Sequence, residues 1–198
     1  MIRSLFLVLL ICLNQSFSQV YNYRSIDAYN SRRVEEIKAE GYYCDIKYVP
    51  QLPSLCVAAS TQMVLYYYGQ EIDQKDIKRQ VDGIMYKDND KRMFSPIYSF
   101  EKLIKGLRYF NVSWETKSYG MTKGDEGLNF IISELKNKRP VLIAAKEHVV
   151  VVNGCHENNK LLLITDPGIE SPGIRIISYQ ELKNIWHSKN YKRFLVKT

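Results

Sequence analysis

Cys56 is the residue whose type and position most clearly suggest chemistry. It opens a charge-poor segment, residues 56–68, whose small and apolar side chains predict a buried helix. Ser54 is a candidate N-cap of that helix. A thiol in the first turn lies at the positive end of the helix dipole, which favours the nucleophilic thiolate. The alternative interpretation is an inert buried cysteine, a common fate of free cysteines.

Two further residues could activate such a thiol. His148 precedes a run of four valines, and Asp166 ends the apolar run 161–165. The polar segment between these runs predicts a β-hairpin. A hairpin centred on position 157 places His148 directly opposite Asp166, with Cβ atoms roughly 5 Å apart. The alternatives are a histidine satisfied in the core and an aspartate that forms a turn before Pro167.

Together, these residues supply the parts of a cysteine nucleophile: a thiol, a base and an orienting carboxylate. His148 would take the proton of the Cys56 thiol, and the thiolate would attack a carbonyl carbon to form a thioester. Asp166 would hold the imidazole in the required orientation and tautomer. Gln51 could donate its side-chain N–H to the oxyanion, beside the backbone N–H of Cys56. The sequence therefore predicts a Cys56–His148–Asp166 triad with Gln51 in the oxyanion hole.

This arrangement resembles the papain-like cysteine peptidases, and most closely the branch that processes bacteriocin precursors at double-glycine leaders. The resemblance covers residues 49–173 and rests on the order Gln51, Cys56, His148 and Asp166 and on a buried helix that ends in Tyr-Tyr-Gly. It implies a papain-like α+β fold, with a helical lobe packed on an antiparallel sheet lobe, and the four roles given above. The double-glycine specificity is not part of the expectation, since these 198 residues contain no transporter segment.

Apolar periodicity places the candidate residues in a chain whose first half is helical and whose second half is rich in strands. Helices are predicted over 21–41, 56–68, 73–81, 96–109, 125–137 and 179–186. Strands are predicted over 44–49, 141–145, 149–152, 161–165, 174–178 and 194–196. Helices followed by strands are typical of an α+β domain, and a cleft between its two lobes is the expected place for a site.

The first eighteen residues have the features of a cleavable secretory signal. Arg3 supplies a positive start, and Leu5–Leu13 is an apolar run too short to span a bilayer. Small residues precede a cleavage site after Ser18. A buried N-terminal helix is the alternative. We therefore predict a signal peptide over 1–18, a peptidase domain over 19–198, and a secreted or periplasmic protein.

Removal of the signal would change the cysteine count. Cys12 would leave with it, so three of the four cysteines remain. If Cys56 is catalytic, Cys44 and Cys155 are left as a pair in an oxidising compartment. A disulfide between these two residues is therefore a hypothesis.

Composition restricts the other classes of function. The chain has 28 Lys and Arg against 21 Asp and Glu, a net charge of +7, and is 45% apolar, all ordinary for a globular protein. Its basic residues are scattered without a nucleic-acid-binding motif, so solvated faces rather than a nucleic-acid site are expected. The histidines and cysteines lack metal-ligand spacing, and no phosphate loop or dinucleotide motif occurs, so neither a metal nor a cofactor is expected.

The leading hypothesis is an exported cysteine peptidase that acts on a peptide or protein substrate and has no membrane anchor after signal cleavage. Deamidation and transpeptidation use the same groups, because attack on an amide carbonyl does not decide whether water or an amine resolves the thioester. A non-catalytic peptide-binding module on the same fold is the third alternative. The oligomeric state stays open.

Overall fold

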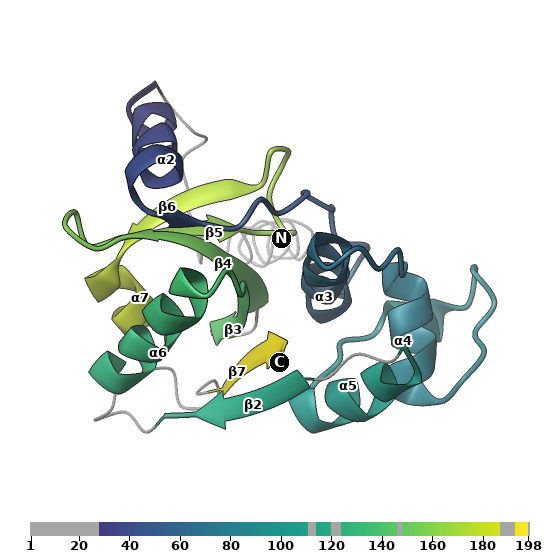
Figure 1. Cartoon of the computed structure of the whole chain (residues 1–198). Coiled ribbons are helices and arrows are strands. Elements are labelled where there is room, and N and C mark those ends of the chain that lie inside the picture. The colour runs from purple at the N-terminus through teal and green to yellow at the C-terminus, as the bar shows by residue number, and fades with distance from the viewer. Residues whose placement is uncertain (1–27, 111–113, 120–123, 146–147, 187–192, 198) are drawn as a thin grey trace, which may run out of the picture.

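The computed structural model describes residues 28–110, 114–119, 124–145, 148–186 and 193–197. The predicted signal peptide, Cys12 and the first residues of the helix predicted over 21–41 lie outside these ranges. Within them, one antiparallel sheet packs against helices (Figure 1). The architecture is therefore α+β, as the order of predicted elements indicates.

A seven-stranded sheet forms the centre of the fold. The strand order is β2-β7-β3-β4-β5-β6, and the short β1 pairs with β4 beside this path. Each paired set of strands is antiparallel. The strands are β1 (Tyr42–Tyr43), β2 (Trp114–Ser118), β3 (Val141–Ala145), β4 (His148–His156), β5 (Leu161–Thr165), β6 (Ile174–Ser178) and β7 (Arg193–Lys197).

Helices form a lobe beside the sheet and also cover it. The helices are α2 (Ala28–Glu40), α3 (Cys56–Tyr67), α4 (Gln74–Asp82), α5 (Phe100–Leu107), α6 (Gly124–Lys136) and α7 (Tyr179–Trp186), with 3₁₀ turns η1 (Lys91–Phe94) and η2 (Arg108–Phe110). In Figure 1, α3, α4 and α5 lie together on one side of the sheet. Of these, α3 packs directly on β4, while α6 and α7 contact each other and β3. The helical and sheet lobes therefore meet along α3 and β4.

The central strands are apolar on both faces because both faces are covered. Along β5, Leu161 and Leu163 pack with Ile37 of α2 in a small core. The alternate residues, Leu162 and Ile164, belong to the main core. Since successive side chains of a strand point to opposite faces, this two-sided cover accounts for the uninterrupted apolar run in the sequence.

Two predicted elements differ from the structure. No strand forms over 44–49; β1 lies just before this range, and the chain continues beside β4 with the Cys44 N–H donating to the Asn153 carbonyl at 2.7 Å. The helix predicted over 96–109 begins only at Phe100, because Ser99 caps it and accepts a hydrogen bond from the Lys102 N–H at 3.2 Å. In addition, β2 was not expected from the sequence.

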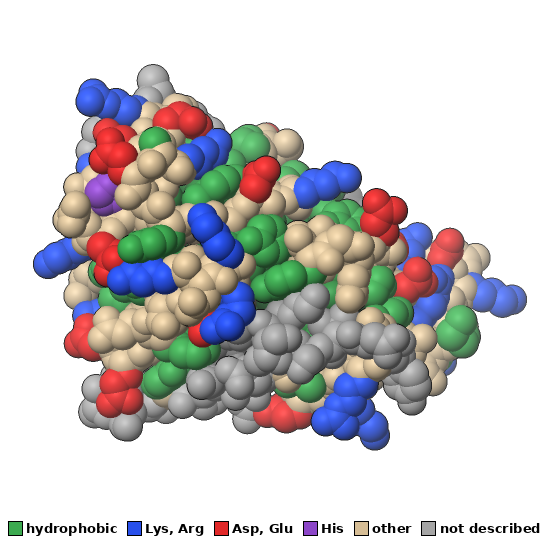
Figure 2. Space-filling model, viewed as in Figure 1, with side chains coloured by type: hydrophobic (Ala, Val, Ile, Leu, Met, Phe, Trp, Pro, Cys, Tyr) green, Lys and Arg blue, Asp and Glu red, His purple; other side chains and the backbone are tan. Residues whose placement is uncertain are grey.

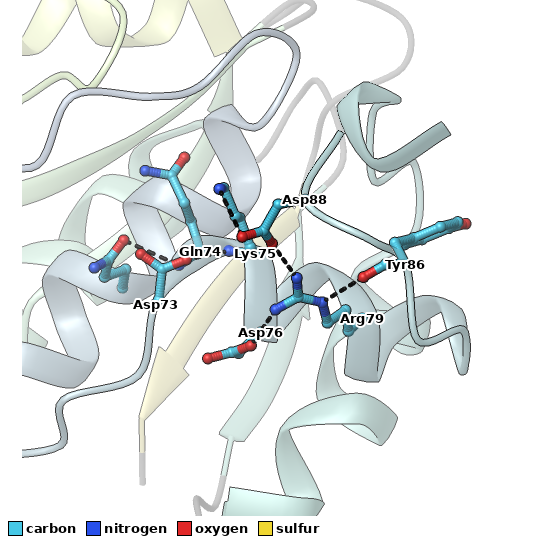
Figure 3. Close-up of polar contacts among 8 residues, drawn as sticks. Asp73, Gln74, Lys75, Asp76, Arg79, Tyr86 and Asp88 are labelled. Carbon is cyan, nitrogen blue, oxygen red and sulfur yellow. Dashed lines mark hydrogen bonds and ion pairs between the residues drawn. The ribbon is translucent and has the colours of Figure 1, made fainter. Parts of the chain in front are cut away.

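Helix α4 is stabilised by a cap and by ion pairs at its surface (Figure 3). The Asp73 side chain accepts a hydrogen bond from a first-turn N–H. Arg79 donates to Asp76 at 2.6 Å, to Asp88 at 2.5 Å and to the carbonyl of Tyr86 at 3.1 Å. These contacts hold the charged segment that follows α4 against the helix.

The surface carries charges of both signs. On the face shown in Figure 2, Lys and Arg side chains are interspersed with Asp and Glu and do not form one continuous patch. Among the helices that the structure describes, none is long and apolar enough to cross a membrane.

Gly41 joins α2 to β1 where the backbone lies against β4. A Cβ atom there would run into the carbonyl oxygen of Cys155 and would lie 2.7 Å from the carbonyl oxygen of Ile37. We expect Gly41→Ala to lower the free energy of unfolding by about 1–3 kcal/mol, measured by urea denaturation. Ala39→Gln, at an exposed position of α2, should change the free energy of unfolding by less than about 0.5 kcal/mol. Equal stability of the two variants would contradict the close packing.

Candidate active site

His148 and Asp166, which the hairpin argument expects to be neighbours, are in direct contact. His148 begins β4, and Asp166 follows the last residue of β5. Nε2 of His148 lies 2.6 Å from Oδ1 of Asp166, and Asp166 is 1% exposed. The backbone N–H of Gly168 donates to the same oxygen at 2.7 Å. The imidazole is therefore held by a buried carboxylate that is itself hydrogen-bonded.

The register that produces this contact differs from the prediction. Val152 pairs with Ile164, two residues beyond the partner that a hairpin centred on position 157 requires. Nearer the turn, from Gly154 to His156, each β4 residue pairs three residues beyond the partner that this hairpin requires. A bulge at Asn153 reduces this offset to two residues. His148 is thus a diagonal rather than a direct neighbour of Asp166, a separation that a long side chain can span.

The bulge also decides which face His148 occupies. With an offset of three residues, His148 and Asp166 would lie on opposite faces of the sheet, because a slip of one residue reverses every side chain. Asn153 is held in the bulge by its Nδ2, which donates to the Cys44 carbonyl at 3.1 Å. Its Oδ1 accepts from the Thr165 hydroxyl at 3.1 Å. The bulge is therefore stabilised by satisfied buried polar groups.

The environment of His148 favours its protonated form. Burial lowers the pKa of His148, but hydrogen bonds to Asp166 and Cys56 and the negative charges of both groups outweigh burial and raise it to about 9. Since Nε2 is bound to Asp166, Nδ1 is the ring nitrogen left to interact with the thiol. At neutral pH the imidazole therefore carries a proton that can be shared with Cys56.

Cys56 is the first residue of α3 and is partly exposed. The expected cap is wrong: Leu55 occupies the N-cap position, and no side chain in the described part of the chain caps the helix. Ser54 instead adopts a positive φ of 62° in a turn closed by the Leu55 N–H, which donates to the Leu52 carbonyl at 3.0 Å. Because no described side chain caps this end of α3, its first-turn N–H groups can bind a developing negative charge.

A buried hydroxyl connects the helix of Cys56 to the strand of His148. Ser60, one turn into α3, donates to the carbonyl of Val149 at 2.9 Å. Ser60 is fully buried. This bond links the two lobes directly beside the thiol and the imidazole.

The segment that carries Gln51 is fixed by contacts on both sides. The Gln51 N–H donates to the Pro167 carbonyl at 2.9 Å. The side chain of Gln74, at the start of α4 (Figure 3), accepts from the Leu52 N–H at 2.9 Å and donates to the Pro50 carbonyl at 3.0 Å. Oε1 of Gln51 is buried and has no hydrogen-bond partner among the residues that the structure describes. The loop is thus placed beside the Asp166 turn, and the oxyanion role of Gln51 stays a prediction.

The sequence argument missed two residues of this region, Gln74 and Arg175. Nη2 of Arg175, on β6, lies 3.0 Å from Oδ2 of Asp166, and the two side chains are 9% and 2% exposed. An arginine within the apolar run 174–177 was the available signal. Gln74 offers no such signal, because a polar residue at the start of a helix is ordinary.

The hypothesised disulfide is not present in the structure. Cys44 and Cys155 are separate, buried thiols. Cys155 pairs with Tyr42 in the β1–β4 ladder, whereas Cys44 bonds to Asn153. The two cysteines are therefore diagonal neighbours, and a diagonal Cβ separation of about 7 Å exceeds the roughly 4 Å of a disulfide.

Among the described residues, no group of His, Cys, Asp and Glu side chains could hold a metal ion.

Comparison with known proteins identifies the family. The Peptidase_C39 like family matches residues 43–193, most of the chain. The chain belongs to this family. No curated protein matches it.

Solved structures show the same fold for this C39-like chain. A double glycine motif protease from an AMS/PCAT transporter, in complex with its leader peptide, has a TM-score of 0.54 at 22% identity, over 80% of this chain and 95% of that chain. The peptidase domain of Streptococcus ComA, a bi-functional ABC transporter, has a TM-score of 0.53 at 17% identity, over 77% and 98%. The predicted papain-like fold and the resemblance to the double-glycine branch are thereby confirmed.

Gly168 leaves no room for a side chain beside the His148–Asp166 contact. A Cβ atom there would lie 2.9 Å from Cε1 and 3.1 Å from Nε2 of His148. We expect Gly168→Ala to separate the pair and to slow alkylation of Cys56 by iodoacetamide at pH 7 about tenfold or more, as the loss of a charged hydrogen bond implies. Glu170→Ala, an exposed change in the same turn, is the control and should react at the native rate. An unchanged rate in Gly168→Ala would contradict this reading of the contact.

The protonation of His148 can be measured without a substrate. Its Cε1–H resonance, assigned by its absence from His148→Asn, should titrate with a pKa of about 9. Because this value is above the ordinary 6.5, the stability contributed by the proton is complete below about pH 6.5 and is lost as the pH rises through about 9. The native protein should therefore lose stability over that interval more than His148→Asn does. A native midpoint at or below 6.5 would contradict the prediction.

Proposed function

We propose that this protein is an exported cysteine peptidase that hydrolyses peptide bonds with Cys56, His148 and Asp166. Membership of the C39-like family supports cysteine-peptidase chemistry on this fold. The observation that carries the proposal is the buried Asp166–His148 contact. The Cys56 side chain is among the groups whose hydrogen bonds and charges raise the pKa of the imidazole. Export is proposed from the signal-like residues 1–18.

The first half-reaction forms the thioester. The Cys56 thiolate attacks the peptide carbonyl carbon, and the carbonyl electron pair moves onto oxygen. The N–H of Cys56 and the side-chain N–H of Gln51 stabilise this oxyanion. His148 then gives the proton on Nδ1 to the departing amine nitrogen as the C–N bond breaks.

The second half-reaction returns the enzyme to its starting state. His148, now neutral, takes a proton from water, and the resulting hydroxide attacks the thioester carbon. The C–S bond breaks, the carboxylic acid leaves, and the thiolate faces the imidazolium again. Asp166 stays ionised throughout and keeps Oδ1 on Nε2 of His148.

The substrate class proposed is an extended peptide or protein segment. The AMS/PCAT protease, which shares the fold, was crystallised with a leader peptide. We do not extend its double glycine motif to this protein.

A peptide-library cleavage profile of the secreted protein tests the proposal. Cys56→Ala should abolish cleavage, and His148→Ala should reduce kcat/KM by about 10³-fold or more, since the thiol and its base act as a unit. Cys44→Ala, which removes another free thiol, is the control and should cleave at the native rate if its circular dichroism is native. Unchanged cleavage by Cys56→Ala would overturn the proposal, and products joined to an added amine would indicate transpeptidation instead.

A further inference from the structure

Asp166 is bound through both of its oxygens. Oδ1 lies against Nε2 of His148 and the N–H of Gly168, while Oδ2 lies 3.0 Å from Nη2 of Arg175. Arg175 pairs with Ile164 across the β5–β6 ladder, two residues before Asp166. Its long side chain therefore reaches Asp166 diagonally along one face of the sheet.

The surroundings of this ion pair are largely apolar. A cavity of about 20 Å³ lies beside His148, Asp166 and Arg175, and its other lining residues are Ala145, Val150, Ile164, Ile177 and Ile185. A charge among such side chains is costly unless another charge compensates it. The carboxylate of Asp166 and the guanidinium of Arg175 meet that requirement for each other.

This pairing affects how the remaining charges at the site balance. If Arg175 compensates Asp166, a proton on His148 is compensated by the thiolate of Cys56. Without Arg175, the charge of Asp166 would be only partly compensated in these apolar surroundings, and its carboxylate would take up a proton more readily. A protonated Asp166 would no longer stabilise the His148 imidazolium that faces the Cys56 thiolate.

We propose that Arg175 is a positioning residue of this site, which keeps Asp166 ionised and turns its carboxylate so that Oδ1 faces Nε2 of His148. The effect of Arg175 on catalysis rests on the proposed peptidase function. The contact of Arg175 with Asp166 is independent of that function.

The charges of His148 and Arg175 also favour the ionised form of Asp166. Burial raises the pKa of Asp166, but the hydrogen bond and charge of His148, the charge of Arg175 and the N–H of Gly168 outweigh burial and lower it below its ordinary value. Tyr48 is a further titratable side chain coupled to this carboxylate, and its own pKa is raised by burial and by the charges of Asp166 and Glu170. Removal of Arg175 should therefore raise the pKa of Asp166.

Carboxyl ¹³C NMR of the full chain, with aspartate labelled and Asp166 assigned by Asp166→Asn, tests this inference. Arg175→Met should move the Asp166 midpoint upward by about 1–3 pH units, the range typical of a carboxylate that loses an adjacent arginine. Arg175→Lys keeps the charge and should reverse most of the shift. Arg139→Met is the matched control, because it also removes an arginine that forms an ion pair, here with Glu134. Arg139 lies just before β3, and the last residue of β3, Ala145, pairs with His148. Arg139→Met should leave the Asp166 midpoint in place.

Activity gives a second readout. Arg175→Met should shift the acid limb of the kcat/KM profile to higher pH by a similar amount and lower kcat with little change in KM, since the side chain of Arg175 is 9% exposed and acts through Asp166. An unmoved Asp166 midpoint in folded Arg175→Met, or the same shift in Arg139→Met, would overturn the inference. If Arg175→Met does not fold, Arg175→Gln removes the charge while keeping a donor and should show the same direction of shift. An unmoved Asp166 midpoint in Arg175→Gln would also overturn the inference.

Because NMR needs no turnover, a chain that cleaves no peptide would refute the peptidase proposal while the titration still decides the role of Arg175.

Discussion

The bulge at Asn153 is the constraint on which the candidate site depends. Successive side chains of a strand point to opposite faces, so an odd offset between β4 and β5 would put His148 and Asp166 on different faces. One extra residue restores the shared face. The bulge is stable because Asn153 exchanges hydrogen bonds with the backbone of Cys44 and with the Thr165 hydroxyl. The buried side-chain amide of Asn153 thus decides whether a His–Asp pair can form.

Once this face is set, the site is governed by the compensation of charge. Asp166 is enclosed between Arg175 and His148, so its carboxylate acts as a fixed negative charge in apolar surroundings. The same contact keeps His148 protonated at neutral pH. The helical lobe supplies Cys56 as the first residue of α3, and the Ser60–Val149 bond holds that lobe against β4. Both lobes are therefore required to bring the groups together.

Residue type alone misled the sequence argument at Ser54 and over 44–49. Ser54 is a favourable cap by type, yet a tight turn at Leu52–Leu55 holds it at positive φ and gives the N-cap position to Leu55. The segment 44–49 is apolar enough for a strand, but its pairing with β4 ends near Cys44, where Asn153 bulges. The same geometry separates Cys44 from Cys155. The last two errors share one cause, since both depend on how β4 pairs with a segment far away in the sequence.

The sequence by itself determined the α+β class, the helix that begins at Cys56, the apolar strands and the chain order of Cys56, His148 and Asp166. These features follow from residue type and from periodicity within short windows. Only the tertiary structure decided the register that joins His148 to Asp166 and the contact of Arg175 with the same carboxylate. Strand register depends on turn placement and on a bulge at Asn153 that no local pattern encodes. An ion pair between neighbouring strands exists only after that register is set.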